Sequence, residues 1–286
     1  MSSILTNASA LSALQSLRET QSALSTTEKQ VSTGLAVSTA ADNASYWSIA
    51  AQLGSDSGVV TAANQALSQS QSVLSTASSA IASITSTINS IQTALTQASN
   101  PGASITNIQT TLTSLGQQLQ DAVSGASFNG LNVLDGSQTA ALNFVAGFNA
   151  SSTGGTINTI SFTSQSLINA GGGILDGGGA TNLLTLGTTV TDATTAQTAL
   201  GNVATVLSNV TTYAAKIGAT QDRMTAASTF NTALTTNYST GISALVDADM
   251  NQASTRLQAL QTQEQLGIQS LSIANQNAQL ILKLFP

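Results

Sequence analysis

The chain has 286 residues, of which only 6% are charged and 3% are aromatic, and it contains neither Cys nor His. Without those residue types the commonest metal ligands and the usual base of a nucleophilic triad are missing. Catalysis by carboxylates alone stays open in principle, but the twelve Asp and Glu residues are mostly scattered singly, so we expect no catalytic centre, no metal and no cofactor. The net charge of −6 includes six scattered basic residues and no basic cluster, which argues against partners such as nucleic acid or an anionic membrane.

Residues 3 to about 34 are predicted to form one helix that ends at Gly34. The segment lacks the basic start and the continuous apolar run of a conventional secretory signal. Its seam positions instead follow each other at spacings of three and four residues, a 3.5-residue repeat that is typical of a helix lying along another helix. These positions are Leu14, Leu17, Gln21, Leu24, Glu28, Val31 and Leu35.

Two more helices are predicted before the spacing of apolar residues changes from helical to alternating at about residue 128. The first covers residues 43 to about 98, and the sequence Asn100-Pro101-Gly102 ends it, because Pro and Gly together stop a helix and favour a turn. The second runs from about residue 104 to residue 124, with Ser104 as its expected N-cap.

Residues 128 to about 190 are predicted to form a small β-rich insert. Residues 128–130 give a turn signal that leads into 131–134, and alternating runs at 141–145 and 156–162 predict strands. The glycine triplets at 171–173 and 177–179 are interpreted as flexible connectors, since no Gly-Lys-Ser/Thr phosphate loop accompanies them.

Helical character returns at about Asp192 and continues past Gly218 to about Tyr238, and a closing helix is expected to start near Ser243. Asp247 and Asp249 are the closest acidic pair, but on a helix they would lie on opposite sides, so we interpret them as a turn or helix start. From Val246 the 3.5-residue repeat reappears, interrupted by one charge at Glu264. Its apolar or small members are Val246, Met250, Ala253, Leu257, Leu260, Gly267, Leu271, Ala274, Ala278, Ile281 and Phe285.

The two terminal helices are therefore predicted to pair with each other as a coiled coil, with the middle of the chain as a long excursion. If they run antiparallel, one common register places Glu28 near Arg256 and Arg18 near Glu264. Charges at a helical seam are costly unless they are paired, so both ion pairs are candidates, with solvated side chains as the alternative.

A second apolar row on the closing helix lies off this seam. Leu266, Ile273 and Leu280 repeat every seven residues, and Ile268, Leu282 and Leu284 lie beside them. A two-helix hairpin would leave this row in water, although each such side chain gains roughly 1.5–3 kcal/mol on burial. An internal domain could cover the row; we favour burial against other copies of the same chain.

These features, taken with four short motifs, resemble bacterial flagellin, and most of all the shorter flagellins of alphaproteobacteria. The motifs are Val31-Ser32-Thr33-Gly34-Leu35 followed by Ala40-Ala41-Asp42-Asn43-Ala44, then Ser127-Phe128-Asn129-Gly130-Leu131, Ile217-Gly218-Ala219-Thr220-Gln221-Asp222-Arg223 and Ala274-Asn275-Gln276. The resemblance covers residues 1–135 and about 195–286. One departure is Ala36, where the family often has a basic residue.

The resemblance implies a mainly α, elongated architecture with a small β-rich insert, and a structural subunit that self-assembles into the flagellar filament used for swimming. Residues 1–42 with 239–286 would form the inner tube, residues 43–130 with 192–238 a surrounding long-helix bundle, and residues 131–191 an outward insert. It also implies a secreted, extracellular protein whose partners are other copies of itself, the flagellar export apparatus, the filament cap and the hook-junction proteins.

Three other functions agree less well with the sequence. The hook–filament junction protein has a related layout, but the Phe-Asn-Gly and Gln-Asp-Arg segments look more like flagellin. Some flagellins carry a catalytic insert, but the insert here has no His-Glu-x-x-His and little volume for a pocket. A Ser/Thr-rich adhesin would usually show β repeats, which this chain lacks.

The resemblance also bears on recognition by hosts. Flagellins that stimulate the vertebrate innate receptor carry an Arg, a Leu and a Glu at three positions, where alignment places Ser90, Ala94 and Thr111 in this chain. The charged and bulky anchors expected of an interface hot spot are absent there, so we expect the protein to escape that receptor.

Overall fold

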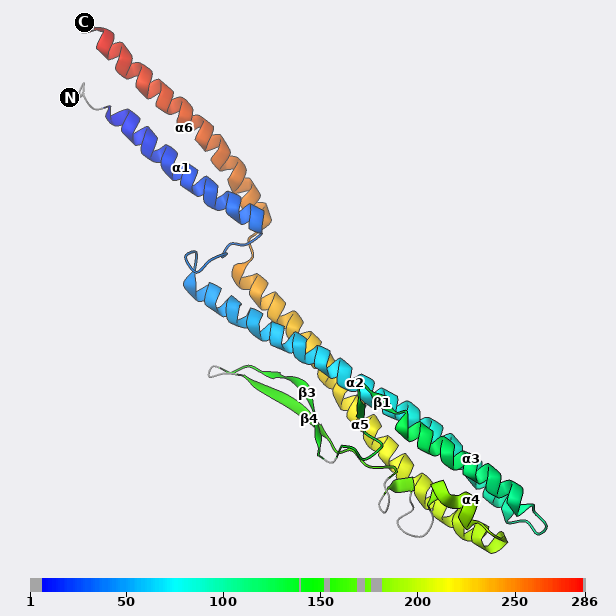
Figure 1. The fold of residues 1–286 in the computed structure, drawn as a ribbon. Coiled ribbons are helices and arrows are strands. Elements are labelled where there is room, and N and C mark those ends of the chain that lie inside the picture. The colour runs from blue at the N-terminus through cyan, green and yellow to red at the C-terminus, as the bar shows by residue number, and fades with distance from the viewer. Residues whose placement is uncertain (1–6, 139, 152–154, 169–172, 176–181, 285–286) are drawn as a thin grey trace. The chain divides into compact units, whose positions relative to one another are not determined.

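The computed structural model describes residues 7–138, 140–151, 155–168, 173–175 and 182–284, without the side chains of 277–284. The chain divides into two compact units, which we call the terminal unit (Met1–Ser55 with Thr236–Pro286) and the inner unit (Asp56–Thr235). The fold is mainly α with a small β-rich part, which confirms the predicted fold class (Figure 1). The elements are α1 (Ala8–Thr33), α2 (Ala44–Ala98), α3 (Ile105–Ser124), β1 (Ser127–Phe128), β2 (Leu131–Asn132), β3 (Leu142–Asn149), β4 (Thr156–Phe162), the short 3-10 helix η2 (Leu183–Thr185), α4 (Leu186–Thr189), α5 (Ala193–Val246) and α6 (Met250–Leu284).

Helix α1 has a well-defined cap at each end. The side chain of Asn7 accepts a hydrogen bond from the Ala10 amide at 3.1 Å and so satisfies a donor of the first turn. At the other end Gly34 adopts φ +73°, the left-handed conformation that a helix C-cap favours and that glycine adopts at little cost. The predicted end at Gly34 is confirmed, whereas the predicted start at residue 3 lies outside the described residues.

The closing helix starts later than predicted. Helix α5 runs without a break to Val246, and α6 begins at Met250 rather than near Ser243. Residues 247–249 form the junction, where the Asp249 carboxylate caps α6 by accepting from the amides of Asn251 at 2.9 Å and Gln252 at 3.2 Å. The interpretation of this pair as a turn or helix start is confirmed for Asp249, which caps α6, whereas Asp247 pairs with Leu35 in an isolated β-bridge.

Three helices of the inner unit enclose its core. Apolar side chains recur along α2, α3 and α5 and are buried in one continuous cluster. Two polar contacts join α2 to α5: Gln71 Nε2 donates to Thr225 Oγ1 at 2.8 Å, and Asn64 Nδ2 donates to Thr232 Oγ1 at 3.4 Å. These pairs lie one heptad apart on each helix and run in opposite directions, so they identify an antiparallel pair of helices in register.

The β-rich part begins with a tight hairpin of β1 and β2. Asn129 and Gly130 occupy its two-residue turn with φ of 51° and 77°. Positive φ at both central residues is the requirement of a type I′ turn, which Asn-Gly meets better than other dipeptides. The turn predicted at 128–130 is confirmed.

Strands β3 and β4 form a second antiparallel hairpin, in register from Leu142↔Phe162 to Asn149↔Thr156 with an irregularity between Val145 and Gly147. At this irregularity the Ala146 carbonyl accepts from Asn231 Nδ2 of α5 at 2.8 Å. Helix α5 thereby satisfies a polar group that the strand pairing leaves free. The strand predicted at 141–145 is confirmed but longer than expected.

Tyr213 links α5 to the segments that follow β2 and β4. Its hydroxyl donates to the Val133 carbonyl at 2.7 Å and accepts from the Gln165 amide at 3.0 Å. The ring lies 6.2 Å from that of Phe162, which lies 6.3 Å from Phe144. Burial raises the pKa of Tyr213 to about 12, so the hydroxyl remains a donor at any physiological pH.

The remaining predictions for the middle of the chain have mixed outcomes. Helix α2 and the turn at 100–102 are confirmed, while Ser104 is an N-cap by position but makes no side-chain cap bond. Residues 183–189 are helical rather than β. Of the two glycine triplets only Gly173 is among the described residues. Within the described ranges, no helix has the length and hydropathy needed to cross a membrane.

Candidate assembly surface

The two terminal helices pair in an antiparallel register that hydrogen bonds fix at both ends. Near the chain termini Asn7 Nδ2 donates to the Ala274 carbonyl of α6 at 3.0 Å. At the other end the Val246 carbonyl accepts from the amides of Ala36 at 2.7 Å and Val37 at 3.2 Å, and the Ala248 amide donates to the Gly34 carbonyl at 2.9 Å. Figure 1 shows α1 and α6 side by side along this length.

Small and apolar side chains fill the seam between α1 and α6. Leu17 and Leu260 are each 9% exposed, and a Cβ at Gly267 would lie 3.1 Å from Leu17 Cδ1, so the missing side chain lets the helices approach. The half-buried leucines and valine of the predicted seam are Leu14, Leu24, Val31, Leu35, Leu257 and Leu271, while Val246 is buried. For Leu280, Ile281 and Phe285 the predicted side-chain positions lie outside the described residues.

Two predicted seam positions face outward. Gln21 and Glu28 are exposed, and Thr27, only 2% exposed, is buried instead. A threonine can be buried at this site because its hydroxyl is satisfied by donating to the Ala23 carbonyl of its own helix at 2.9 Å. An ideal helix has 3.6 residues per turn, so a strict 3.5-residue pattern drifts off the seam by one position.

The charges proposed as register pairs lie along the edges of the seam. Arg18, Glu28 and Arg256 are exposed, and Glu264 is half-buried. Glu264 Oε1 accepts a hydrogen bond from Gln21 Nε2 at 3.2 Å, which agrees with the antiparallel register. The Arg18–Glu264 and Glu28–Arg256 pairs stay predictions.

The off-seam row of α6 is open to solvent. Leu266 is 56% exposed, Ile268 53% and Ile273 59%. Helix α1 therefore does not cover this row. We call these three residues, extended by Leu280 in the sequence, the outer α6 row.

A groove of about 690 Å³ runs beside the outer α6 row. Ala and Ser line it from both helices, with Ile273 at its edge, and none of the described lining residues is charged. Small side chains allow another helix to approach closely, and no charged group has to be desolvated on contact, while the serine hydroxyls need hydrogen-bond partners when they are buried. The lining residues are Ala8, Ser9, Ser12, Ala13, Ser16, Ser270, Ile273 and Ala274.

The loop between α1 and α2 is organised around Asp42. One oxygen of its carboxylate accepts from the backbone amides of Thr39 at 2.8 Å and Ser38 at 3.0 Å, and from both hydroxyls. These bonds, led by that of the Thr39 amide, lower the pKa of Asp42 to about 2. The acidic residue of the predicted Ala-Asp-Asn motif thus shapes the loop that connects the two helices.

The three receptor-related positions differ in exposure. Ser90 and Thr111 are exposed, with their hydroxyls bonded to the Ser86 and Asn107 carbonyls of their own helices. Ala94 is only 6% exposed and belongs to the core cluster. Only two of the three side chains are thus available to a partner, and receptor escape stays a prediction.

Comparison with known proteins agrees with this paired-helix arrangement. The family described as "Bacterial flagellin N-terminal helical region" matches residues 4–139, and "Bacterial flagellin C-terminal helical region" matches residues 200–285. The chain belongs to the bacterial flagellin family. Its terminal pairing brings together the two segments that these family profiles describe.

Similar proteins come from three alphaproteobacteria. The chain is 40% identical over 290 residues to a flagellin of Brucella melitensis, with 100% of this chain and 99% of the relative covered. It is 37% identical over 319 residues to flagellin C of Rhizobium meliloti, with the same coverage. It is 34% identical over 288 residues to flagellin FljK of Caulobacter vibrioides, again covering 100% and 99%. The resemblance inferred from the sequence is confirmed, and the junction-protein alternative is not favoured.

As a member of the flagellin family, the chain is a structural subunit of the bacterial flagellar filament. We therefore consider the exposed face of α6 as the candidate assembly surface. What the sequence missed was the groove beside the outer α6 row. The small residues at 8, 9, 12, 13 and 16 on α1 are the sequence signal that could have indicated it.

Proposed function

We propose that the chain joins other copies of itself through the outer α6 row and the adjoining groove, giving a helical homopolymer. The carrying observation is the exposure of Leu266, Ile268 and Ile273 on a helix whose other face is already paired with α1. Large apolar side chains spaced along one helix favour association, since each gains roughly 1.5–3 kcal/mol when it leaves water. A row beside an uncharged groove suits a second helix of the same kind.

We also propose a place in the filament for each of three parts of the chain. The terminal segments, 1–42 and 239–286, would supply the inner-tube contacts, and the helices at 43–130 and 192–238 a surrounding layer. The insert at 131–191 would face outward. This three-part division is finer than the two compact units, and it is supported by the place of the β-rich residues within the inner unit.

The remaining partners follow from filament assembly. The subunit would leave the cell through the flagellar export apparatus, add to the filament beneath its cap, and meet hook-junction proteins at the filament base. Freedom from Cys supports export as an unfolded chain, because no disulfide can trap it. We infer an extracellular, non-enzymatic role, which the membership in a family of structural proteins supports.

The test of this proposal is polymerisation of a variant whose outer α6 row is made polar. Leu266→Ser, Ile273→Ser and Leu280→Ser together should leave a folded monomer that no longer extends a seeded filament. The matched control is Gln261→Ser, Gln263→Ser and Gln265→Ser on the same helix, where exposed polar residues are exchanged. Filament growth is followed by light scattering and electron microscopy, and folding by circular dichroism. Normal extension by the apolar-row variant would contradict the proposal.

A further inference from the structure

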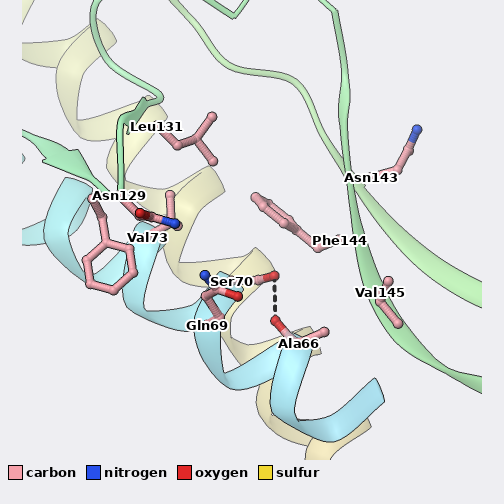
Figure 2. A pocket seen from close by; sticks show the side chains of 10 residues that line it. Ala66, Gln69, Ser70, Val73, Asn129, Leu131, Asn143, Phe144 and Val145 are labelled. Carbon is pink, nitrogen blue, oxygen red and sulfur yellow. Dashed lines mark hydrogen bonds between the residues drawn. The ribbon is translucent and has the colours of Figure 1, made fainter. Parts of the chain in front are cut away.

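A small cavity, which we call the hairpin pocket, lies at the surface of the inner unit. It measures about 270 Å³ and lies between α2, the β1–β2 hairpin and β3. Figure 2 shows Phe144 of β3 pointing across it toward α2, with Leu131 and Val73 nearby. None of its ten described lining residues is charged. The pocket is therefore suited to an apolar group and unsuited to an ionic ligand.

The size of the pocket narrows the choice of occupant. Sites for small organic ligands usually measure roughly 300–1,000 Å³, and this pocket is smaller. It can accept one large side chain. The hydroxyl of Ser70 on the pocket wall already donates to the Ala66 carbonyl at 2.9 Å, so it does not require a polar ligand (Figure 2).

A large apolar side chain on another face of the same unit lacks a partner. Phe230 of α5 is 65% exposed, whereas Phe144 and Phe162 are buried in the core and Phe128 and Phe148 are half-buried. Ala226 and Ala233, each within four residues of Phe230, are also exposed, so Phe230 projects from a low surface. An exposed aromatic residue flanked by alanines is typical of an interface anchor.

Phe230 and the hairpin pocket belong to different faces of the inner unit. Met224 and Asn231 are buried, and Asn231 reaches the carbonyl of Ala146 on β3, the strand that borders the pocket. On a helix Phe230 points about 100° away from Asn231, and Ala226 and Ala233 lie farther round on the same side. Thr225 and Thr232, which contact α2, lie roughly 140–160° round the helix from Phe230, so Phe230 points away from α2 and to the side of β3.

When an exposed side chain on one face of a subunit binds a pocket on another face of the next subunit, the contact is head-to-tail. Phe230 and the hairpin pocket are such a pair. Such a contact repeats without closing unless its rotation closes a ring, and an open repeat is the geometry of a filament. We propose that Phe230 of one subunit inserts into the hairpin pocket of a neighbouring subunit. This inference rests on the proposed self-assembly but assigns it a second contact, in the inner unit and separate from the outer α6 row.

Truncation of the anchor is the first test. Phe230→Ala should raise the critical concentration for filament growth at least about tenfold, because an aromatic group is no longer buried at each contact. Monomer stability should not change, because Phe230 is exposed in the monomer. Thr229→Ala, at the neighbouring exposed position, is the matched control and should polymerise like the unaltered chain. Ser70→Leu, which fills the pocket from α2, should weaken growth to a similar extent as Phe230→Ala.

Cross-linking tests the contact directly. Because the chain has no Cys, a maleimide reagent links only the cysteines that are introduced. Gln69→Cys on the pocket rim is combined with Ala226→Cys or with Ala233→Cys beside Phe230, and the protein is treated with a short bis-maleimide. Filaments of at least one of these combinations should give a ladder of linked subunits that monomers do not give. Thr111→Cys with Ala233→Cys serves as the control without a pocket residue, and it should give no ladder.

The outcomes separate the two proposals. Filaments that form normally with Phe230→Ala and give no ladder with either combination overturn the pocket contact and leave self-assembly through α6 intact. Failure of the unaltered chain to extend seeds at all overturns the proposed function and, with it, this inference. A ladder in filaments together with weakened growth of Phe230→Ala supports the contact.

Discussion

The inner and terminal units bury their side chains to very different degrees. Among the residues whose side chains are described, the largest fully buried ones belong to the inner unit, including Tyr213, Phe162, Leu67, Ile84 and Leu119. In the terminal unit the best-buried leucines, Leu17 and Leu260, stay 9% exposed, while Leu266 and Ile273 are more than half exposed. The inner unit thus has its own core. The terminal pair resembles half of a core, and in our proposal a neighbouring subunit supplies the other half.

The largest expected effect tests this contrast by removing the terminal unit. A chain of residues 56–235 should fold with a cooperative thermal transition, because the core cluster lies entirely within those residues. It should not polymerise, because it lacks α1 and α6. Calorimetry and seeded growth measure the two properties. A fragment that is unfolded by circular dichroism would show that the inner unit depends on the terminal helices.

The next largest effect concerns how much the Tyr213 hydroxyl contributes to the free energy of unfolding of the inner unit. Tyr213→Phe removes the hydroxyl that bonds to Val133 and Gln165 and leaves a buried carbonyl without its partner. Such a loss costs about 1–3 kcal/mol of unfolding free energy. Tyr46→Phe, at a tyrosine that is 47% exposed, is the matched control and should have almost no effect. Urea unfolding compares them, and equal stabilities would mean that the hydroxyl bonds contribute nothing.

A smaller effect is expected for the charges along the terminal seam. Double-mutant cycles for Arg18 with Glu264 and Glu28 with Arg256, using alanine at each site, should give coupling of at most about 1 kcal/mol, since exposed ion pairs are weak. A cycle for Gln21 with Glu264 is the reference, because that hydrogen bond is seen at 3.2 Å. Absence of coupling in both charged pairs would count against them as register markers, although not against the antiparallel pairing.

The smallest effect concerns pH at the loop between α1 and α2. The folded-state pKa of Asp42 is about 2, below its ordinary value of 3.8, because amides and hydroxyls of Thr39 and Ser38 stabilise the carboxylate. A lowered pKa stabilises the folded loop above pH 4, and that stabilisation is lost as the pH falls from about 4 through 2. The protection factors of the Ser38 and Thr39 amides, which compare each exchange rate with the intrinsic rate at the same pH, should therefore fall over this window. In Asp42→Asn the exchange should be faster at neutral pH and lack this change; an unchanged profile would exclude the carboxylate as its cause.

Local patterns were enough to predict much of this protein. The 3.5-residue repeat predicted that α1 and α6 pair, and the row of Leu266 and Ile273 followed from the same repeat, because side-chain direction on a helix depends only on spacing. The Asn129-Gly130 turn was equally predictable, since its positive φ values suit few other dipeptides. These features depend on residues that are close in sequence.

Contacts between distant residues decided the rest. Helix α5 ends at Val246 and α6 starts at Met250 because the intervening backbone bonds to residues 34–37, a pairing that no local pattern specifies. Thr27 rather than Glu28 lies in the seam, because an α-helix has 3.6 residues per turn whereas the sequence repeat used for the prediction has 3.5. The hairpin pocket likewise depends on how β3 and the β1–β2 hairpin pack beside α2, and the exposure of Phe230 depends on which face of α5 the inner unit covers. Sequence periodicity thus determined which faces are apolar, and tertiary packing determined which of them remain uncovered.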